Sequence, residues 1–460
     1  MISNAQILQD KIKTRTARVG IIGLGYVGLP LAVEFAKAGF TVTGFELDGF
    51  KIEEVNAGRS YIPDVLTQNV KELVDDQKLW ATSDFQHLSA IDAVIICVPT
   101  PLKKTKDPDI QYIVAACESI VEYLHAPMFI SLESSTYPGT TDELMLPMFV
   151  AKGFEVGKDF FLCFSPERVD PGNTKYQTKN IPKVIGGITP ACTKIGEMLY
   201  QTAIDTIVPV EGTRTAEMVK LLENTFRMIN IGLVNELAMM CDKMNINIWD
   251  VIDAAKTKPF GFMPFYPGGV GGHCIPIDPF YFSWKAKQYG CEPRFIETAG
   301  YVNSEIPHYV VEKVQDALNT EKKPINGSKI LLLGMAYKKD VDDVRESPAI
   351  DVAHLLLDKG AELSYFDPYI PKARVNGQNL ESIDLLALDD AIAESDCVVI
   401  TTDHSIMDYI GVLEQSKMLI DTKNAVRRSG SLWPSVAESG HCVLYKYRCE
   451  STNSDTRTTN

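Results

Sequence analysis

Cys274 lies in a glycine-rich loop that suits a reactive thiol. Residues 268–279 have the sequence GGVGGHCIPIDP, with four glycines in five positions before the cysteine. Glycine lets the backbone approach a ligand closely, and Pro276 and Pro279 stiffen the chain after the cysteine. A thiol becomes a good nucleophile when a nearby cation lowers its pKa. The loop, with Asp278 four positions on, therefore favours covalent catalysis by Cys274 over the alternative role of a small buried thiol.

Lys220 and Asn224 form a second candidate pair. They lie one turn apart in residues 213–243, a segment without proline whose apolar residues recur at helical spacing. One face of a helix would present the ammonium and the amide to the same ligand atom. Taken alone, such a pair more often belongs to an exposed helix face.

A glycine motif, Gly23-Leu24-Gly25-Tyr26-Val27-Gly28, follows an apolar run and precedes a helical stretch. This context is typical of a dinucleotide site, where the glycines admit the pyrophosphate and the helix N-terminus attracts its charge. Glu46 comes 18 positions after Gly28, at the end of the next predicted strand. A carboxylate there accepts the ribose hydroxyls and repels a 2′-phosphate, so NAD is favoured over NADP. The alternative is a structural glycine turn with a solvated Glu46.

A basic segment follows the second glycine-ended run. Gly334 stands where the first motif has three glycines, and Lys338, Lys339 and Arg345 come after it. In a chain with a net charge of −15, these cations could hold phosphates locally. Three aspartates within residues 340–343 could instead balance a solvated loop, and charge alone favours that alternative.

The two ends of the chain share a series of predicted strands in the same order. The matching segments are 18–25 with 329–334, 39–48 with 360–368, 91–101 with 395–404, and 127–136 with 417–424. Continuous apolar strands that alternate with helical stretches indicate parallel sheets covered on both faces. The sequence therefore predicts an α/β protein with two Rossmann-like, doubly wound domains.

Residues 213–243 predict one long central helix that joins these domains. Its apolar surface is wider than one neighbouring helix covers, so we expect it to serve as a dimer interface as well. We predict an NAD-binding domain over 1–212, a helical dimerisation and catalytic domain over 213–316, a C-terminal substrate domain over 317–450 and a disordered tail over 451–460.

Composition excludes several functions. The chain has 460 residues, of which 60 are acidic and 45 basic, the wrong balance for nucleic-acid binding. No apolar run is long enough to cross a membrane, and the first 17 residues are charged where a signal peptide is apolar. The ten cysteines include no CxxC pair, and Cys97 and Cys397 lie in apolar runs typical of a core. We expect a cytoplasmic protein that needs no metal.

The motifs together resemble the UDP-glucose/UDP-N-acetylhexosamine 6-dehydrogenase family. GLGYVGLP, PTP, SSTYPGTT, SPERVDPG, AEMVKLLENT, GGHCIPIDP and YKKDVDDVRESP occur in the family's order over about residues 18 to 425. GGHCIPIDP, with KPFGF upstream, is most similar to the bacterial UDP-N-acetylglucosamine 6-dehydrogenases that supply surface-polysaccharide sugars. The resemblance implies NAD-dependent oxidation of a UDP-sugar to its uronic acid.

The resemblance also implies catalytic roles. Cys274 would form a thiohemiacetal and then a thioester with the sugar C6, and Lys220 and Asn224 would stabilise the C6 oxygen as charge develops. Asp278 would lie near the thiol and the ammonium. Thr136 would order a water molecule, and Glu167 would be the acid that assists thioester hydrolysis.

The binding residues come from the glycine motif and the resemblance together. The expected NAD contacts are Gly23, Gly25, Tyr26, Val27, Gly28, Glu46, Pro99, Thr100, Ser135, Thr136 and Arg345. The expected UDP-sugar contacts are Glu167, Arg168, Val169, Lys220, Asn224, Lys258, Phe265, Tyr266, Gly268, Gly271, Tyr337, Lys338 and Lys423. Lys423 stands where the family commonly has an arginine, and it lacks the planar fork of that side chain. His273, beside the nucleophile, has no expected role.

Three functions remain open at this point. A four-electron UDP-sugar dehydrogenase uses every residue named above, with UDP-N-acetylglucosamine the favoured substrate and UDP-glucose or UDP-GalNAc the alternatives. A two-electron dehydrogenase of the β-hydroxyacid type needs no cysteine and would make one NADH per turnover instead of two. A nucleotide-sensing protein would need neither Cys274 nor Asp278.

Overall fold

The computed structural model describes residues 2–103, 107–170, 172–173, 175–272 and 274–430. The predicted disordered tail and His273 lie outside the described residues. The described chain divides into two compact units. The first comprises residues up to Thr225 together with Ile277–Pro293, and the second comprises Phe226–Pro276 together with the chain from Arg294. The three-part division predicted from the sequence stays a prediction.

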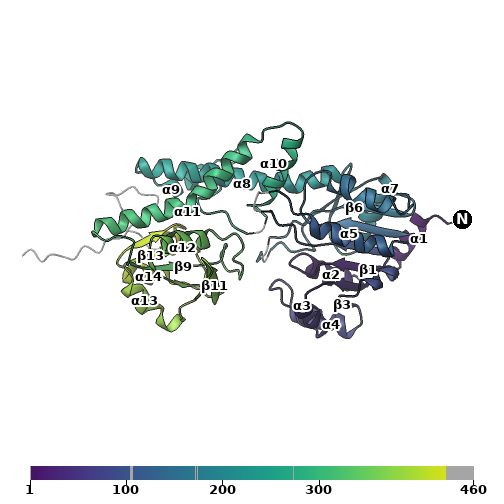
Figure 1. Cartoon of the computed structure of the whole chain (residues 1–460), viewed down its shortest axis with the longest axis horizontal. Helices are drawn as coiled ribbons and strands as arrows, with labels where there is room; N and C mark the ends of the chain where they lie inside the picture. Colours follow the sequence, from purple (N-terminus) through teal and green to yellow (C-terminus); the bar gives the residue numbers. More distant parts are fainter. Residues whose placement is uncertain (1, 104–106, 171, 174, 273, 431–460) are drawn as a thin grey trace, which may run out of the picture. The chain divides into compact units, whose positions relative to one another are not determined.

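The first unit is built on an eight-stranded sheet with the order β3-β2-β1-β4-β5-β6-β7-β8. Figure 1 labels β1, β3 and β6 of this sheet. All neighbours are parallel except β6 and β7, which are antiparallel. Its strands are β1 (Arg18–Ile22), β2 (Thr41–Phe45), β3 (Leu79–Thr82), β4 (Ala93–Ile96), β5 (Met128–Leu132), β6 (Phe160–Phe164), β7 (Lys183–Gly187) and β8 (Ile207–Pro209).

Helices cover both faces of this sheet, because residues alternate between the faces along each strand. Val19 and Ile21 of β1 lie in a core with residues of α2 and α7, whereas Ile22 lies in a core with residues of α5. The helices of this unit are α1 (Asn4–Lys13), α2 (Gly28–Lys37), α3 (Gly49–Asn56), α4 (Thr67–Asp75), η1 (Phe85–Ala90), α5 (Gln111–Tyr123), η2 (Thr140–Met145), α6 (Leu146–Val150), α7 (Pro190–Tyr200), the first part of α8 (Thr213–Lys243) and α10 (Asp278–Gln288).

The second unit contains a four-stranded parallel sheet with the order β10-β9-β13-β14. Ile330 and Leu332 of β9 pack in a core with residues of α11 and α12, and Leu331 and Leu333 pack on the α13 and α14 side. The elements of this unit are the rest of α8, α9 (Ile248–Ala255), α11 (Arg294–Thr320), β9 (Lys329–Leu333), α12 (Pro348–Asp358), β10 (Glu362–Phe366), β11 (Lys372–Val375), β12 (Gln378–Glu381), η3 (Leu385–Ala387), α13 (Leu388–Glu394), β13 (Cys397–Ile400), α14 (Tyr409–Gln415), β14 (Leu419–Asp421) and α15 (Ala425–Arg428).

The predicted repeat is confirmed strand by strand. β9, β10, β13 and β14 take the places in their sheet that β1, β2, β4 and β5 take in theirs. Both sheets are covered on two faces, as the continuous apolar strands predict. The α/β fold with two Rossmann-like sheets and a long central helix is therefore confirmed, and Cys97 and Cys397 are buried.

The predicted helix over residues 213–243 is observed as α8, which begins in the first unit and ends in the second. In the second unit α8 crosses α11 closely, because Gly232 has no side chain. A Cβ there would lie 3.1 Å from the Cβ of Ala299. No helix in the described part of the chain is long and apolar enough to span a membrane.

Candidate active site

The glycine motif forms the turn between β1 and α2 in the first unit. Gly23 has a φ of +90°, and a Cβ on Gly28 would lie 1.9 Å from the Gly23 carbonyl oxygen, so both positions require glycine for the turn itself. A Cβ on Gly25 would meet no atom within 4 Å. The Gly25 backbone therefore faces open space, as close approach by a pyrophosphate at the start of α2 requires. Tyr26 and Val27 complete the turn.

Glu46 lies just after β2, beside this turn. Its Oε2 accepts a hydrogen bond from the Leu24 N–H at 3.0 Å and lies 3.2 Å from the Lys51 ammonium. Burial raises the pKa of Glu46, but the Leu24 amide and the Lys51 charge outweigh that effect and lower the pKa below its usual value. Glu46 is thus held as a carboxylate at the strand end where a ribose is expected.

The loops after β4 and β5 carry the other NAD contacts expected in this unit. Pro99 is exposed, and Thr100 is buried with its carbonyl accepting a hydrogen bond from the Tyr281 hydroxyl of α10 at 2.5 Å. Ser135 and Thr136 follow β5, and the Thr136 hydroxyl lies 2.7 Å from that of Thr140. Arg345, the remaining expected contact, belongs to the second unit, where its guanidinium pairs with Asp343 at 2.7 Å.

One face of α8 forms hydrogen bonds with three segments of the first unit. Glu217, Lys220 and Asn224 follow each other at spacings of three and four, which places them on the same side of the helix. The Lys220 ammonium donates to the Glu167 carbonyl oxygen at 2.6 Å, and the Asn224 amide donates to Asp278 Oδ2 at 2.6 Å. The structure therefore brings the predicted residues Lys220, Asn224, Glu167 and Asp278 together.

Asp278 begins α10 and is completely buried. Burial raises its pKa to about 6, although the Lys220 charge and the Asn224 amide oppose the rise. Its second oxygen, Oδ1, is buried and has no hydrogen-bond partner in the described part of the chain. A buried acceptor of this kind is costly unless a ligand or water satisfies it, which is expected in a binding site.

Glu217 fixes the loop that carries Thr136. Its Oε2 accepts the Gly139 N–H at 2.5 Å, and its Oε1 accepts the N–H and the hydroxyl of Thr141 at 2.9 and 2.7 Å. Burial raises the pKa of Glu217 to about 7 despite these donors. The carboxyl thus caps the helical segment that starts at Thr140 and holds Thr136 one turn before it.

Glu167 lies in the loop after β6, and its carboxyl makes three polar contacts. Oε1 accepts the N–H groups of Arg168 and Val169, both at 2.7 Å, and Oε2 lies 3.5 Å from the Lys183 ammonium. Burial raises the pKa of Glu167, but Lys183 and the two amides lower it further than burial raises it. Glu167 is therefore ionised. The Arg168 side chain is paired with Glu223 at 2.6 Å.

The Cys274 loop belongs to the second unit, where it packs on the segment after β9. The Gly272 N–H donates to the Arg345 carbonyl at 3.0 Å, and a Cβ on Gly271 would lie 2.7 Å from the Cβ of Tyr337. Glycine is needed here for close packing between two backbone segments. Cys274 itself is half-buried and forms no disulfide.

A cavity lies in the second unit beside this loop. Its lining includes Asn235, Trp249, Gly268, Tyr337, Thr402 and Lys423. The Lys423 ammonium forms no ion pair with any described carboxylate, and burial lowers its pKa. Aromatic walls and one cation suit a nucleotide.

The remaining expected substrate contacts also lie in the second unit. The ring of Tyr266 stacks on that of Trp249 with the centroids 5.3 Å apart, and Phe265 makes an edge contact with Phe226. The exposed Lys258 lies over the ring of Phe260 at 5.2 Å.

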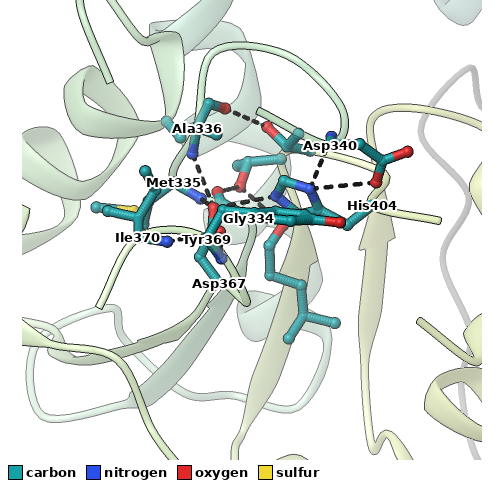
Figure 2. A network of polar contacts seen from close by, with 12 residues as sticks. Gly334, Met335, Ala336, Asp340, Asp367, Tyr369, Ile370 and His404 are labelled. Carbon is teal, nitrogen blue, oxygen red and sulfur yellow. Dashed lines mark hydrogen bonds and ion pairs between the residues drawn. The ribbon is translucent and has the colours of Figure 1, made fainter. Parts of the chain in front are cut away.

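A buried network holds the segment that carries Tyr337 and Lys338 (Figure 2). Asp367 Oδ2 accepts the N–H groups of Met335 and Ala336 at 2.6 and 2.9 Å and lies 3.0 Å from His404 Nε2. The other ring nitrogen of His404 accepts the Asp340 N–H at 3.0 Å. Together these bonds fix both ends of the segment just after β9.

Sequence reasoning missed the supporting residues Lys183, Glu133, Glu217, Asp367 and His404. A signal existed for Asp367, because it follows β10 as Glu46 follows β2, and each accepts the N–H just after the first glycine of its turn. No comparable signal marked Lys183, which lies 50 residues from its partner Glu133.

The chain matches one family of known proteins over most of its length. Three domain models of the UDP-glucose/GDP-mannose dehydrogenase family match the chain: the NAD binding domain over residues 17–204, the central domain over 214–305 and the UDP binding domain over 331–428. UDP-N-acetyl-D-glucosamine 6-dehydrogenase of Pseudomonas aeruginosa is 36% identical over 355 residues, which are 77% of this chain and 83% of that protein.

Two archaeal relatives extend the comparison. UDP-N-acetyl-D-mannosamine dehydrogenase of Pyrococcus horikoshii is 33% identical over 421 residues, 89% of this chain and 96% of that protein. A solved structure of the UDP-D-ManNAc dehydrogenase from the same organism superimposes with a TM-score of 0.81, and the match covers 89% of this chain and 96% of that one. A UDP-glucose dehydrogenase of Pyrobaculum islandicum, 26% identical, gives a TM-score of 0.79 with coverage of 89% and 95%. The chain therefore belongs to the UDP-glucose/GDP-mannose dehydrogenase family and is an NAD-dependent oxidoreductase that acts on a UDP-sugar.

Proposed function

We propose that the protein oxidises the C6 hydroxyl of a UDP-N-acetylhexosamine, UDP-N-acetylglucosamine first among them, to the carboxylate in two successive steps. The observation that carries this proposal is the α8 face on which Lys220 and Asn224 meet the Glu167 loop and Asp278. Cys274 precedes Asp278 by four residues. That length of chain limits the separation of their Cα atoms to at most about 14 Å.

Lys220 and Asn224 act on the C6 oxygen in both oxidations. NAD, when bound, accepts a hydride in each oxidation, one molecule per step. The hydroxyl proton must leave as the hydride leaves, and the ammonium and the amide stabilise the negative charge that develops on the oxygen. Asp278, with a pKa of about 6, lies within hydrogen-bond reach of Asn224 and can take up the proton.

Cys274 keeps the intermediate aldehyde on the protein. Its sulfur adds to the aldehyde carbon as the carbon–oxygen double bond becomes single and the oxygen takes up a proton, which gives a thiohemiacetal. Loss of the second hydride from that carbon and of the hydroxyl proton to Asp278 then converts the adduct to a thioester. A free aldehyde could hydrate or escape, whereas the carbon–sulfur bond holds it for the second oxidation.

Water then opens the thioester. It adds to the carbonyl carbon, the carbon–sulfur bond breaks, and the thiolate leaves with the electron pair. Since Glu167 is ionised, it suits the acceptance of the water proton rather than the role of acid that the resemblance implies. Thr136, fixed through Glu217, orients the water.

The choice of sugar rests on the relatives. Two of these relatives, 36% and 35% identical to this chain, are named UDP-N-acetyl-D-glucosamine 6-dehydrogenase. The cavity with Lys423 would take the UDP moiety, together with Tyr337, Lys338 and the Gly268–Gly271 segment, while Lys258, Phe265 and Tyr266 would border the sugar. We place the reaction in surface-polysaccharide biosynthesis and expect the active form to be at least a dimer.

NADH release across UDP-GlcNAc, UDP-GalNAc, UDP-ManNAc and UDP-glucose tests the function. We expect two NADH per sugar and the highest kcat/KM with an N-acetylated sugar, UDP-GlcNAc ahead of the others. One NADH per sugar would support a two-electron dehydrogenase instead. A higher kcat/KM with UDP-glucose would move the protein to the glucose enzymes.

The Cys274→Ser variant tests the covalent step. A serine hydroxyl is a far weaker nucleophile near neutral pH than a thiol, so turnover should fall by orders of magnitude with the block after the aldehyde or at the ester. Lys220→Ala should instead raise the activation barrier of both oxidations by about 2.7 to 4 kcal/mol, as expected for loss of an oxyanion donor. A Cys274→Ser enzyme that still released two NADH per sugar at the parental rate would disprove covalent catalysis.

A further inference from the structure

Two buried charges, Lys183 and Glu133, lie behind the proposed site in the interior of the first unit, next to the partly exposed carboxyl of Glu167. Lys183, the first residue of β7, places its ammonium 2.8 Å from Glu133 Oε2 and 3.5 Å from Glu167 Oε2. The side chain of Lys183 is 6% exposed and that of Glu133 is not exposed at all. Both side chains are therefore almost wholly enclosed by the first unit.

Glu133 is itself fixed and holds the ammonium in place. Its Oε1 accepts a hydrogen bond from the Tyr200 hydroxyl at 2.5 Å, and that hydroxyl also lies 3.1 Å from Ser131 Oγ. β5 supplies Ser131, the residue after β5 is Glu133, and α7 ends at Tyr200. Rigid elements thus position the ammonium at Glu167 from behind.

A buried ion pair contributes little to stability, because desolvation offsets most of the attraction between the charges. The electrostatic effect on a neighbouring, largely enclosed group is larger, since water screens it only weakly. Glu167 is that neighbouring group, and Lys183 opposes the effect of burial on its pKa more than any other residue does. Without the ammonium, only the two backbone amides and the Lys220 charge would oppose the effect of burial, so the pKa of Glu167 should rise.

We propose that Lys183, held by Glu133, is a positioning residue that keeps Glu167 ionised and oriented for opening the acyl-enzyme, while the two oxidations do not depend on it. This inference rests on the proposed function. It deepens that proposal by assigning the buried lysine to one step of the reaction.

The separation between the steps follows from how the Glu167 loop is held. Lys220 contacts the Glu167 backbone carbonyl and not its carboxylate. Lys183 also lies 3.5 Å from the Pro166 carbonyl oxygen, but the start of the loop has two further anchors. The Ser165 N–H donates to the Leu132 carbonyl at 2.9 Å, and the Ser165 hydroxyl donates to the Val184 carbonyl at 2.8 Å. Removal of Lys183 should therefore leave Lys220 in place for both oxidations.

The Lys183→Met variant tests the inference, with NAD and the UDP-N-acetylhexosamine that the parent turns over fastest. We expect a burst of two NADH per active site at close to the parental rate, followed by steady turnover at least tenfold slower. Acid quenching followed by mass spectrometry should show the acyl group on the peptide that contains Cys274. Hydroxylamine, a nucleophile that needs no base, should restore turnover in the variant and change the parent little.

The pH profile gives a second signature that a structural defect would not produce. The slow phase of Lys183→Met should become faster as pH rises and Glu167 ionises, with its half-maximal pH at least one unit above that of the parent. Lys194→Met, which removes an exposed lysine paired with Glu197 on α7, is the matched control and should behave as the parent does.

Two further variants keep the outcomes separable. If Lys183→Met fails to fold, the double variant Lys183→Met/Glu133→Gln removes both buried charges and still deprives Glu167 of its cation. Glu167→Gln is the positive reference. If acyl-enzyme accumulates in Glu167→Gln and turnover stays fast in the lysine variants, the role of Lys183 is disproved. If no acyl-enzyme forms even in Glu167→Gln, the covalent pathway of the proposed function fails instead.

Discussion

Asp278, which is buried, and Glu167, which is partly exposed, are two carboxyls of one site whose pKa values are shifted in opposite directions. Glu167 accepts two backbone N–H groups and faces Lys183, and its pKa is lowered. Asp278 accepts one amide, keeps one oxygen without a partner among the described residues, and has a pKa of about 6. Carboxyls whose environments separate their pKa values in this way are suited to different proton transfers.

Asp278 also makes stability depend on pH. Its folded pKa of about 6 lies above its usual value of 3.8, so between these pH values the folded state binds more protons than the unfolded state. Stability should therefore fall as pH rises through this window, by about 3 kcal/mol in total for a shift of this size. Asp278→Asn should abolish this contribution while it keeps an acceptor for Asn224.

Unfolding monitored by tryptophan fluorescence from pH 4 to pH 8 checks the prediction. The free energy of unfolding of the parent should fall relative to Asp278→Asn up to about pH 6 and run parallel to it above pH 7. Curves that stay parallel throughout would show that Asp278 ionises freely in the folded protein. Glu217 titrates in both proteins, so the comparison isolates Asp278.

Glu46 should determine the choice of cofactor. Its carboxylate would repel a 2′-phosphate, and Lys51 lies 3.2 Å from it, ready to pair with a phosphate once the carboxylate is removed. The parent should strongly prefer NAD, and Glu46→Ser should lower the ratio of kcat/KM for NAD over NADP by roughly tenfold or more. Glu53→Ser changes an exposed residue of α3, the helix that also carries Lys51, and should leave the ratio unchanged. Comparable kcat/KM values for both cofactors in the parent would remove this assignment.

Residues close in the sequence could be predicted as a group, whereas those joined only by the fold could not. GLGYVG and Glu46 are linked by the regular length of a strand–helix–strand unit. Lys220 and Asn224 are linked by one helical turn. Glu133 and Lys183 come together because β5 and β7 lie in the same sheet with β6 between them, and no local pattern encodes that distance.

At the level of elements, the β1–α2 turn contains two kinds of glycine. A Cβ on Gly28 would overlap the Gly23 carbonyl, so Gly28→Ala should destabilise the fold by about 1 to 3 kcal/mol. A Cβ on Gly25 would meet only open space, so Gly25→Ala should fold normally yet bind NAD at least tenfold more weakly. Thermal midpoints and NAD titrations of the two variants separate these effects. NAD affinity that is unchanged in Gly25→Ala would place the pyrophosphate elsewhere.

Element types were predictable because most strands are buried on both faces. Strands such as β4 and β13 contain only buried residues and appear in the sequence as unbroken apolar runs. The antiparallel pairing of β7 with β6 was not predictable, because strand direction depends on a connection of 18 residues in which no described residue forms a helix or strand. A parallel connection would need a crossover helix.

At the level of the whole molecule, α8 carries an exposed apolar stripe. Phe226, Leu233, Leu237 and Met240 are 46%, 52%, 39% and 52% exposed, at spacings of seven, four and three residues. These spacings place all four on one side of the helix, as in helices that pair with a second helix. Since such stripes are rarely left in water, we expect a dimer built on α8.

The double variant Leu233→Lys/Leu237→Lys should separate the subunits. Sedimentation should show a dimer or larger species for the parent and a monomer for the variant. We also expect Lys258 to reach the active site of the neighbouring subunit in the dimer, so the variant should lose activity. Leu386→Lys changes an equally apolar residue on η3 that is 93% exposed, and this variant should sediment as the parent does. A parent that is monomeric and active at assay concentration would disprove both the dimer and the role of Lys258.

The carboxylates that follow β2 and β10 have consequences for attempts to rebuild a cofactor site. Both carboxylates accept backbone amides on both oxygens. The Glu46 side chain is 12% exposed at the edge of an open turn, whereas that of Asp367 is not exposed at all and also meets His404. Grafting three glycines into the turn after β9 would restore the sequence motif of a dinucleotide domain but not a group able to hold a ribose. An engineer would have to replace His404 and release Asp367 first, and the Tyr337 segment would lose its anchor as a result.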